Sequence, residues 1–356
     1  MSTKKPLGLG LVGIGRAGWG MHLPELASRQ DKIQVVAACD IEAPRGQRAA
    51  ERLNCRMYTK FQYLLADPDV EVVSIATRSP DHTPHALAAL KAGKYVYLEK
   101  PIAITMEQAR QLQRAATTGA GKGKLFIRHN RRHEPAFVHI REIIASGILG
   151  DVYEIKLHRH GFTRRDDWQA LIGCGGGLLN NWGPHIVDHA LQFLESPLAE
   201  VWSDLKRVAA VGDAEDHLHL ILKGKNNRVV DMEISGGAAI AEPVYVVFGT
   251  RGALTSDEKN ITLRYLDPKQ KLQKRKASPS TPPQEGSFGS PETLNWVEKT
   301  IAVKPAGLAG MEILWDCLYD TIRNRKPFPI KLAEALEVVR VSCLVKKGTP
   351  FAPKTK

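Results

Sequence analysis

The sequence predicts an α/β protein in which a doubly wound parallel sheet is followed by an α+β domain with a mixed or antiparallel sheet. Apolar strands alternate with helical patterns through residues 1–128, which is typical of parallel sheets with right-handed crossovers. Residues 129–356 contain runs of strands without helices between them, which indicates a different sheet. A chain of 356 residues also exceeds one ordinary core, so we predict two domains with these bounds.

The first strand and turn carry a dinucleotide-binding pattern. Apolar residues 7–12 run into Gly13, Gly15 and Gly18, spaced as G-x-G-x-x-G, and Asp40 ends the next strand. The glycines allow a tight turn, close approach of a pyrophosphate, and close packing of helix on strand, while the helix N-terminus attracts the phosphates. An acid at the position of Asp40 binds the adenosine ribose. The pattern predicts a Rossmann domain that binds NAD, with NADP as the alternative because an arginine follows nearby.

The alternation continues to residue 128. We expect further strands at 33–39, 70–77, 95–99 and 124–128, and helices at 46–53, 61–66, 82–92 and 105–118. The carboxyl ends of parallel strands share one edge of a sheet, which is where open α/β folds bind ligands. Gly13, Asp40, Thr77 and Lys100 are therefore expected to meet at one rim.

Lys100 is the first candidate for chemistry. The apolar strand before it ends in Glu99, Lys100 and Pro101, and a proline cannot donate to a sheet ladder. In isolation, a strand-end pair of this kind is more often a solvated ion pair. Its place beside a cofactor makes Lys100 a site residue, with Glu99 orienting it or balancing its charge.

The second half changes character after residue 128. A helix is expected at 135–146, followed by strands at 151–160, 216–223, 228–235 and 243–249. Helical patterns return at 291–303, 310–323 and 331–346.

Composition narrows the class of protein. The net charge of +12 is spread along the chain without a basic tail or an aromatic-interleaved RNA motif, so we expect an anionic cofactor and no nucleic acid. Five scattered cysteines without a CxxC pair suit free thiols in a reducing compartment. No apolar run reaches the roughly 18 residues that span a bilayer, and the start lacks a signal-peptide pattern. We expect a cytoplasmic protein that does not bind membranes.

Three consecutive glycines, at residues 175–177, precede a helical pattern with polar side chains on neighbouring turns: His185, Asp188 and His189. Three interpretations stay open. His185 can be a hydrogen-bonded structural histidine. The three side chains can bind a metal with Cys174, although their spacing matches no common zinc motif. His185 can also transfer a proton in the cofactor cleft, because imidazole titrates near neutral pH.

Several separated stretches resemble the glucose-fructose oxidoreductase / inositol dehydrogenase / MocA (Gfo/Idh/MocA) family of NAD(P)-dependent sugar oxidoreductases. In order, they are Gly13–Gly18, Ile75-Ala76-Thr77 with His82, Glu99-Lys100-Pro101, Asn130-Arg131-Arg132 with Pro135, Gly175-Gly176-Gly177, Gly183-Pro184-His185 with Asp188, and residues 247–254 and 334–340. Together they cover nearly the whole chain, and Glu-Lys-Pro with Gly-x-His is far more specific than the glycine loop.

The resemblance implies a large open sheet in the second domain, a last helix (about 331–346) that packs back toward the first, and a homodimer or homotetramer. It implies that Lys100 and His185 flank the reacting carbon, without a metal. The cofactor contacts it implies are Gly13, Gly15, Arg16, Ala17, Asp40, Thr77, His82, Glu99 and Lys100. The substrate contacts we expect are Arg131, Arg164, Asp167, Trp168 and Asn181, the alternative for the three in the middle being a solvated loop.

One position departs from the family pattern. Where the family often has an aspartate four residues before the histidine, this chain has Asn181, which cannot accept a proton. The carboxylate of an aspartate–histidine relay is therefore missing, and the acid–base work falls on Lys100 or His185.

The function expected is hydride transfer between NAD(P) and a secondary hydroxyl or ketone of a sugar, sugar acid or cyclitol. One alternative is an enzyme with tightly bound NAD that oxidises its substrate transiently for elimination, epimerisation or glycoside cleavage. The other is a non-catalytic dinucleotide-binding protein, because a fold alone does not determine function.

Overall fold

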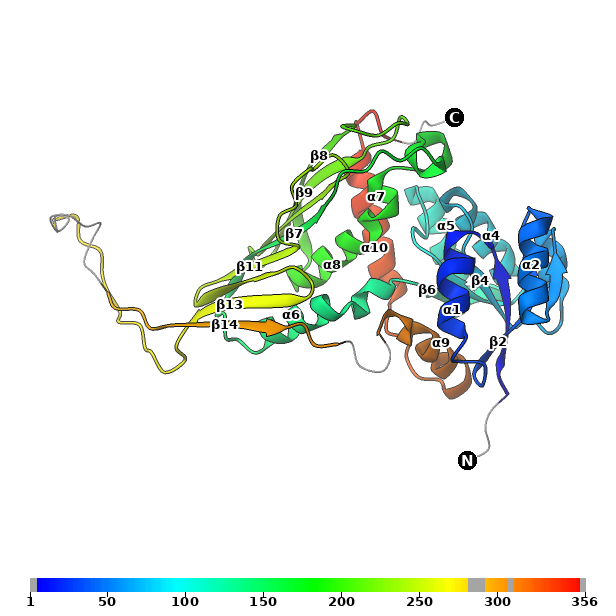
Figure 1. The fold of residues 1–356 in the computed structure, drawn as a ribbon, viewed down its shortest axis with the longest axis horizontal. Coiled ribbons are helices and arrows are strands. Elements are labelled where there is room, and N and C mark those ends of the chain that lie inside the picture. Colours follow the sequence, from blue (N-terminus) through cyan, green and yellow to red (C-terminus); the bar gives the residue numbers. More distant parts are fainter. Residues whose placement is uncertain (1–4, 281–291, 306–309, 353–356) are drawn as a thin grey trace.

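The structure is a computed structural model that describes residues 5–280, 292–305 and 310–352. It contains two sheets that lie one after the other along the long axis of the molecule, with helices between them (Figure 1). The first sheet is parallel and the second is large and mixed, so the predicted fold class is confirmed.

The first sheet has the strand order β3-β2-β1-β4-β5-β6, which is that of a Rossmann domain. Its strands are β1 (Leu7–Val12), β2 (Ile33–Cys39), β3 (Arg56–Tyr58), β4 (Val72–Ile75), β5 (Tyr95–Leu98) and β6 (Leu125–Ile127). The connecting helices are the π-helical segment η1 (Gly18–His22) with α1 (Leu23–Leu26), α2 (Ala43–Leu53), α3 (Phe61–Ala66), α4 (Ser79–Lys91) and α5 (Met106–Thr117). Thr105 caps α5, accepting a hydrogen bond from the Gln108 N–H at 3.2 Å.

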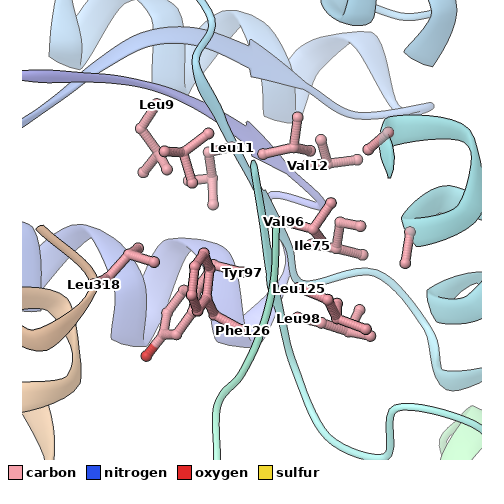
Figure 2. Close-up of a cluster of buried hydrophobic side chains, with 14 of the residues drawn as sticks. Leu9, Leu11, Val12, Ile75, Val96, Tyr97, Leu98, Leu125, Phe126 and Leu318 are labelled. Atoms are coloured by element: carbon pink, nitrogen blue, oxygen red, sulfur yellow. The ribbon is translucent and has the colours of Figure 1, made fainter. Parts of the chain in front are cut away.

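The core of this domain follows from apolar strands covered on both faces. Figure 2 shows the alternation: Tyr97 points to one side of the sheet, and Val96 and Leu98 point to the other. The side of Tyr97 is covered by α9 (Ile313–Asn324), with Leu318 in this core and Trp315 only 4.5 Å from Tyr97 between ring centroids. A helix from the end of the chain therefore completes the first core.

The second sheet has the order β14-β13-β12-β11-β7-β10-β9-β8. Its strands are β7 (Val152–His160), β8 (Leu198–Lys206), β9 (His217–Gly224), β10 (Val229–Ser235), β11 (Tyr245–Gly249), β12 (Gly252–Ser256), β13 (Asn260–Leu266) and β14 (Trp296–Ala302). Among the described strand pairs of this sheet, β7–β10 is parallel and the others are antiparallel. Alternate residues of β9, such as Leu218, Leu220 and Leu222, are fully buried, so one face of the sheet packs on helices. These helices are α6 (Pro135–Ala145), α8 (Gly183–Leu194) and α10 (Leu332–Lys346).

The expected helix at 291–303 is wrong over its described part. Residues Trp296–Ala302 form strand β14, which pairs antiparallel with β13 at the edge of the sheet. Val297 and Ile301 pack on the second core and stand four residues apart. That spacing fits one face of a helix and one face of a strand equally well, and only pairing with β13 decides between them.

Helix α10 contributes to both cores. Ala335 and Val339 belong to the first apolar cluster, whereas Val338, Val341 and Val345 belong to the second. The helix lies between the two sheets in Figure 1, which explains why apolar residues occur on more than one of its faces. In the part of the chain that is described, no helix is both long and apolar enough to cross a membrane.

Arg132 joins three elements next to the second core. Its Nε and Nη2 donate to both oxygens of Asp188 in α8, at 2.7 and 2.6 Å, and its Nη1 donates to Glu334 of α10 at 2.5 Å. Asp188 is only 2% exposed.

We expect Arg132→Met to destabilise the protein by about 3–5 kcal/mol, because it leaves a buried carboxylate without its cation. Urea unfolding measures this, with Arg340→Met as the control. Arg340 pairs with Glu337 on the exposed side of α10 and should cost less than about 1 kcal/mol. Equal losses would contradict the prediction.

Candidate active site

The glycine loop after β1 has the shape that a dinucleotide needs. Gly13 has φ +88°, and a Cβ there would lie 2.7 Å from the carbonyl carbon of Ala76. A Cβ on Gly18 would lie 2.0 Å from the carbonyl oxygen of Gly13. Around Gly15, by contrast, a Cβ would meet no heavy atom of the described chain within 4 Å. The loop is packed tightly at its two ends and open in the middle, as the approach of a pyrophosphate requires.

Asp40 follows β2 and lies beside this loop. Its carboxylate accepts hydrogen bonds from the N–H groups of Ile14, at 2.7 Å, and Glu42, at 2.9 Å. These bonds hold the carboxylate against the turn, in the position where an acid meets the adenosine ribose of a bound dinucleotide. Arg16 is exposed and Ala17 is half-buried where the chain enters the π-helical segment.

His82 ties two strand ends of the rim together. Its Nε2 lies 3.0 Å from the carbonyl oxygen of Thr77, after β4, and its Nδ1 lies 2.7 Å from that of Pro101, after β5. The side chain is buried, and burial lowers the pKa of His82 below its usual value. His82 therefore links the segments that follow β4 and β5 at the rim.

Lys100 reaches across from the first domain to the second. Its Nζ donates to the carbonyl oxygen of Asn181 at 2.9 Å. Burial lowers the pKa of Lys100 to about 8; the Glu99 carboxylate opposes that shift, and the guanidinium groups of Arg131, Arg128 and Arg16 add to it. A lysine with this pKa exists in both protonation states near neutral pH, which is what proton transfer or charge stabilisation at a reacting carbon requires.

His185 lies one helical turn after the carbonyl that Lys100 contacts. Its side chain is buried, and Nδ1 has no hydrogen-bond partner among the described residues. Burial first, and then the charges of Lys100 and Arg131, keep the pKa of His185 well below its usual value. The imidazole is therefore neutral at physiological pH, and a neutral imidazole can accept a proton.

The two neighbours of His185 have structural partners. Asp188 is held by Arg132, as described above. His189 stacks on Phe137 at 3.9 Å between ring centroids, and its Nε2 lies 2.8 Å from the carbonyl oxygen of Arg131. Both side chains thus pack α8 (Gly183–Leu194) against the rest of the domain.

Asn181 ends α7 (Leu178–Asn181), and its side chain is held by Gln169. Its Nδ2 donates to Gln169 Oε1 at 3.0 Å, in the short helix η4 (Trp168–Ala170). Asp167 caps η4 through the N–H of Gln169, at 2.9 Å, and pairs with Arg165. Burial opposes ionisation of Asp167, but the hydrogen bonds from Arg165 and from the Gln169 N–H outweigh burial and lower the pKa of Asp167. Arg164, two residues after a bridge between Phe162 and Gly237, is exposed.

Trp182 adds an aromatic wall next to His185, with 6.2 Å between the ring centroids. The guanidinium carbons of Arg131 and Arg159 lie 4.3 and 5.6 Å from the Trp182 centroid. Both arginines pair with Glu134, and Arg159 also pairs with Glu258 at 2.6 Å. The indole ring of Trp182 is therefore held by cation–π contacts with two arginines that are themselves paired with carboxylates.

Taken together, the loop, the acid after β2 and the lysine on the same rim define a dinucleotide-binding enzyme. Residues 7–123 match the oxidoreductase family with an NAD-binding Rossmann fold, and residues 137–255 match the GFO/IDH/MocA C-terminal domain. The uncharacterized oxidoreductase YdgJ of Escherichia coli (strain K12) is 30% identical over 248 residues, 69% of each chain.

Two further similarities cover more of the chain. The scyllo-inositol 2-dehydrogenase (NADP(+)) IolW of Bacillus subtilis (strain 168) is 25% identical over 350 residues, 94% of this chain and 91% of that one. The solved structure of an NAD-binding protein from Listeria innocua superimposes with a TM-score of 0.77 at 25% identity, over 95% of this chain and 93% of that one. The protein belongs to the Gfo/Idh/MocA family of NAD-binding oxidoreductases.

Sequence reasoning did not indicate two parts of the site region. Trp182 stood inside a stretch noted for its glycines and histidines, and its contacts with Arg131 and Arg159 join residues far apart in sequence. The partners of the Glu99 carboxylate, His22 and Arg128 at 2.9 Å each, were not indicated either. The domain bounds and the roles of the site residues stay predictions.

Proposed function

We propose that the protein transfers hydride between NAD and a secondary hydroxyl or ketone of a sugar, sugar acid or cyclitol. The observation that carries this is the contact of Lys100 Nζ with the carbonyl of Asn181, four residues before His185, whose buried Nδ1 has no hydrogen-bond partner among the described residues. The name of IolW, an inositol dehydrogenase, supports a polyhydroxylated substrate.

The chain's own residues divide the work as follows. His185 accepts the hydroxyl proton during oxidation, because its depressed pKa keeps it neutral. Lys100 donates a hydrogen bond to the substrate oxygen and stabilises the negative charge that develops there. The nicotinamide supplies the hydride acceptor or donor when NAD is bound. Asp40 and the glycine loop hold the other end of the dinucleotide.

The charges around the site also favour acidic members of this substrate class. The guanidinium groups of Arg131 and Arg16 lie close enough to Lys100 to add to the lowering of its pKa that burial causes. A carboxylate on the substrate is stabilised by that surplus of positive charge.

The pH dependence separates the two possible bases. If His185 is the base and Lys100 acts as a cation, kcat/KM stays high below the usual histidine pKa and falls as pH rises through about 8, where Lys100 loses its proton. If Lys100 is the base, kcat/KM instead rises through the same pH. Initial rates at subsaturating substrate across about pH 5 to 10 measure this. A rise through pH 8 would reverse the two roles.

A screen of sugars, sugar acids and cyclitols with NAD and NADP in parallel tests the function itself. Accumulation of NADH with one of them is the expected result. Substrate conversion without net NADH would favour a transient oxidation by tightly bound NAD. Asn181, in place of the aspartate that the family often has, is the residue that motivates this alternative. Binding of NAD without conversion of any compound would overturn the proposal. The homodimeric or homotetrameric state and the cytoplasmic location stay predictions that gel filtration and fractionation can test.

A further inference from the structure

Behind Lys100 runs a chain of buried ionic hydrogen bonds. Glu99 Oε1 lies 2.9 Å from Arg128 Nη1, and Arg128 Nη2 donates to both oxygens of Glu25, at 2.5 and 2.7 Å. At the far end the indole Nε1 of Trp315 donates to Glu25 at 2.7 Å. His22 completes the set, with Nε2 at 2.9 Å from Glu99 and Nδ1 at 3.0 Å from the hydroxyl of Ser74.

These residues come from different elements that surround the end of β5. His22 and Glu25 lie on the helix after the glycine loop, Arg128 follows β6, and Trp315 lies on α9. The side chain of Arg128 is 1% exposed and that of Glu25 is 12% exposed. Burying three charged groups costs several kcal/mol each, and their close pairing with one another offsets that cost.

The charges of the chain do not cancel within it. Two carboxylates, of Glu25 and Glu99, enclose one guanidinium, so these three groups carry one net negative charge, to which His22 adds only if it is protonated. The Glu99 carboxylate at one end of the chain acts on the ammonium of Lys100. The other titratable or charged groups that act on Lys100 or feel its charge are Arg16, Arg131, His82, His129 and His185.

We propose that Glu25 and Arg128 are positioning residues for Lys100: through Glu99 they hold the end of β5 in place and set how readily the Lys100 amine gives up its proton. This inference rests on the role of Lys100 in the proposed function, and deepens it. Because Glu25 and His22 stand on the helix that follows the glycine loop, the same bonds fix Lys100 relative to the phosphate end of the cofactor site.

Glu25→Gln tests the proposal without touching the substrate side of the site. The change removes one carboxylate charge, so Arg128 compensates Glu99 more fully, less negative charge stabilises the Lys100 ammonium, and the pKa of Lys100 falls. We expect acetic anhydride to label the Lys100 amine about threefold faster at pH 7 than in the wild-type protein, as followed by mass spectrometry of the Lys100 peptide. Glu25→Asp keeps the charge and is expected to restore a rate near that of the wild type.

Asp316→Asn is the matched control. Asp316 is the neighbour of Trp315 on α9, but it pairs with Arg29 and Lys32 in the segment after α1, whereas Glu25 pairs with Arg128. The proposal requires faster labelling in Glu25→Gln alone. Unchanged labelling in Glu25→Gln, or equal acceleration in Glu25→Gln and Asp316→Asn, overturns it.

Trp315→Phe provides a second test should Glu25→Gln not fold. It removes the N–H that holds Glu25 but keeps every charge, so Arg128 is drawn toward Glu25 and compensates Glu99 less. Slower labelling of Lys100 is then expected, and unchanged labelling overturns the proposal. Labelling requires no turnover, so its result stands even if the substrate screen fails. Conversely, unchanged labelling leaves the proposed reaction intact.

Discussion

Replacing Lys100 with methionine is expected to lower kcat by about 10²- to 10⁴-fold, with the Kd for NAD changed far less. The reason lies in the geometry, since the Lys100 ammonium stands on the rim that carries the cofactor loop and contacts the carbonyl one helical turn before His185. Methionine fills a similar volume but neither donates a hydrogen bond nor carries charge. Steady-state rates with the best compound from the screen, together with NAD titration, measure both effects.

Lys124→Met is the control for Lys100→Met. Lys124 also donates its Nζ to a backbone carbonyl, that of Gly93 at 2.8 Å, but it precedes β6 and so stands at the opposite edge of the same sheet. Its loss should leave kcat within about twofold of the wild-type value. Near-normal turnover of Lys100→Met would remove Lys100 from the mechanism.

Gly15→Ala is expected to weaken NAD binding by a hundredfold or more, roughly 3 kcal/mol, without lowering Tm. Its new methyl group meets no heavy atom of the described chain within 4 Å, so the fold has room for it. The methyl group instead projects into the space through which a pyrophosphate approaches the helix N-terminus. Calorimetric titration with NAD and a thermal melt separate binding from stability.

Gly20→Ala and Gly18→Ala are the two controls for Gly15→Ala. Gly20 has equally open surroundings but lies within the π-helical segment, so its alanine variant should keep both Tm and NAD affinity. A Cβ on Gly18 would lie 2.0 Å from the carbonyl oxygen of Gly13, so that variant should lose stability as well as binding. If Gly15→Ala behaves like Gly20→Ala, the loop is not the phosphate site.

Most elements of the first domain could be predicted, because their apolar patterns lie within short stretches of the sequence. Continuous apolar runs mark buried parallel strands, and the predicted helix at 61–66 coincides with α3 (Phe61–Ala66). The short strand β3 (Arg56–Tyr58) was missed, since three residues are too few to show a period. In the second domain, β14 was taken for a helix, because the spacing of Val297 and Ile301 fits the period of a helix as well as that of a strand. Only its pairing with β13 makes this segment a strand.

The candidate site divides in a similar way. Gly13, Asp40, Thr77 and Lys100 were expected at one rim because parallel strands align their carboxyl ends, a rule that needs no coordinates. The partners of Glu99 are different, since His22, Arg128 and the more distant Trp315 come from separate parts of the chain. A buried arginine and an exposed one look alike in a sequence, so no local signal identified Arg128.

Glycine spacing and strand alternation are properties of neighbouring residues, so they were enough to predict a dinucleotide-binding sheet with a lysine at the carboxyl end of one strand. The surroundings of that lysine depend on how distant segments fold together. Its ammonium meets the Asn181 carbonyl, and a buried chain through Glu99, Arg128 and Glu25 lies behind it. The physical reason is burial: the charge state of an amine depends on desolvation and on charges within a few ångströms, and these come from segments that only folding brings together.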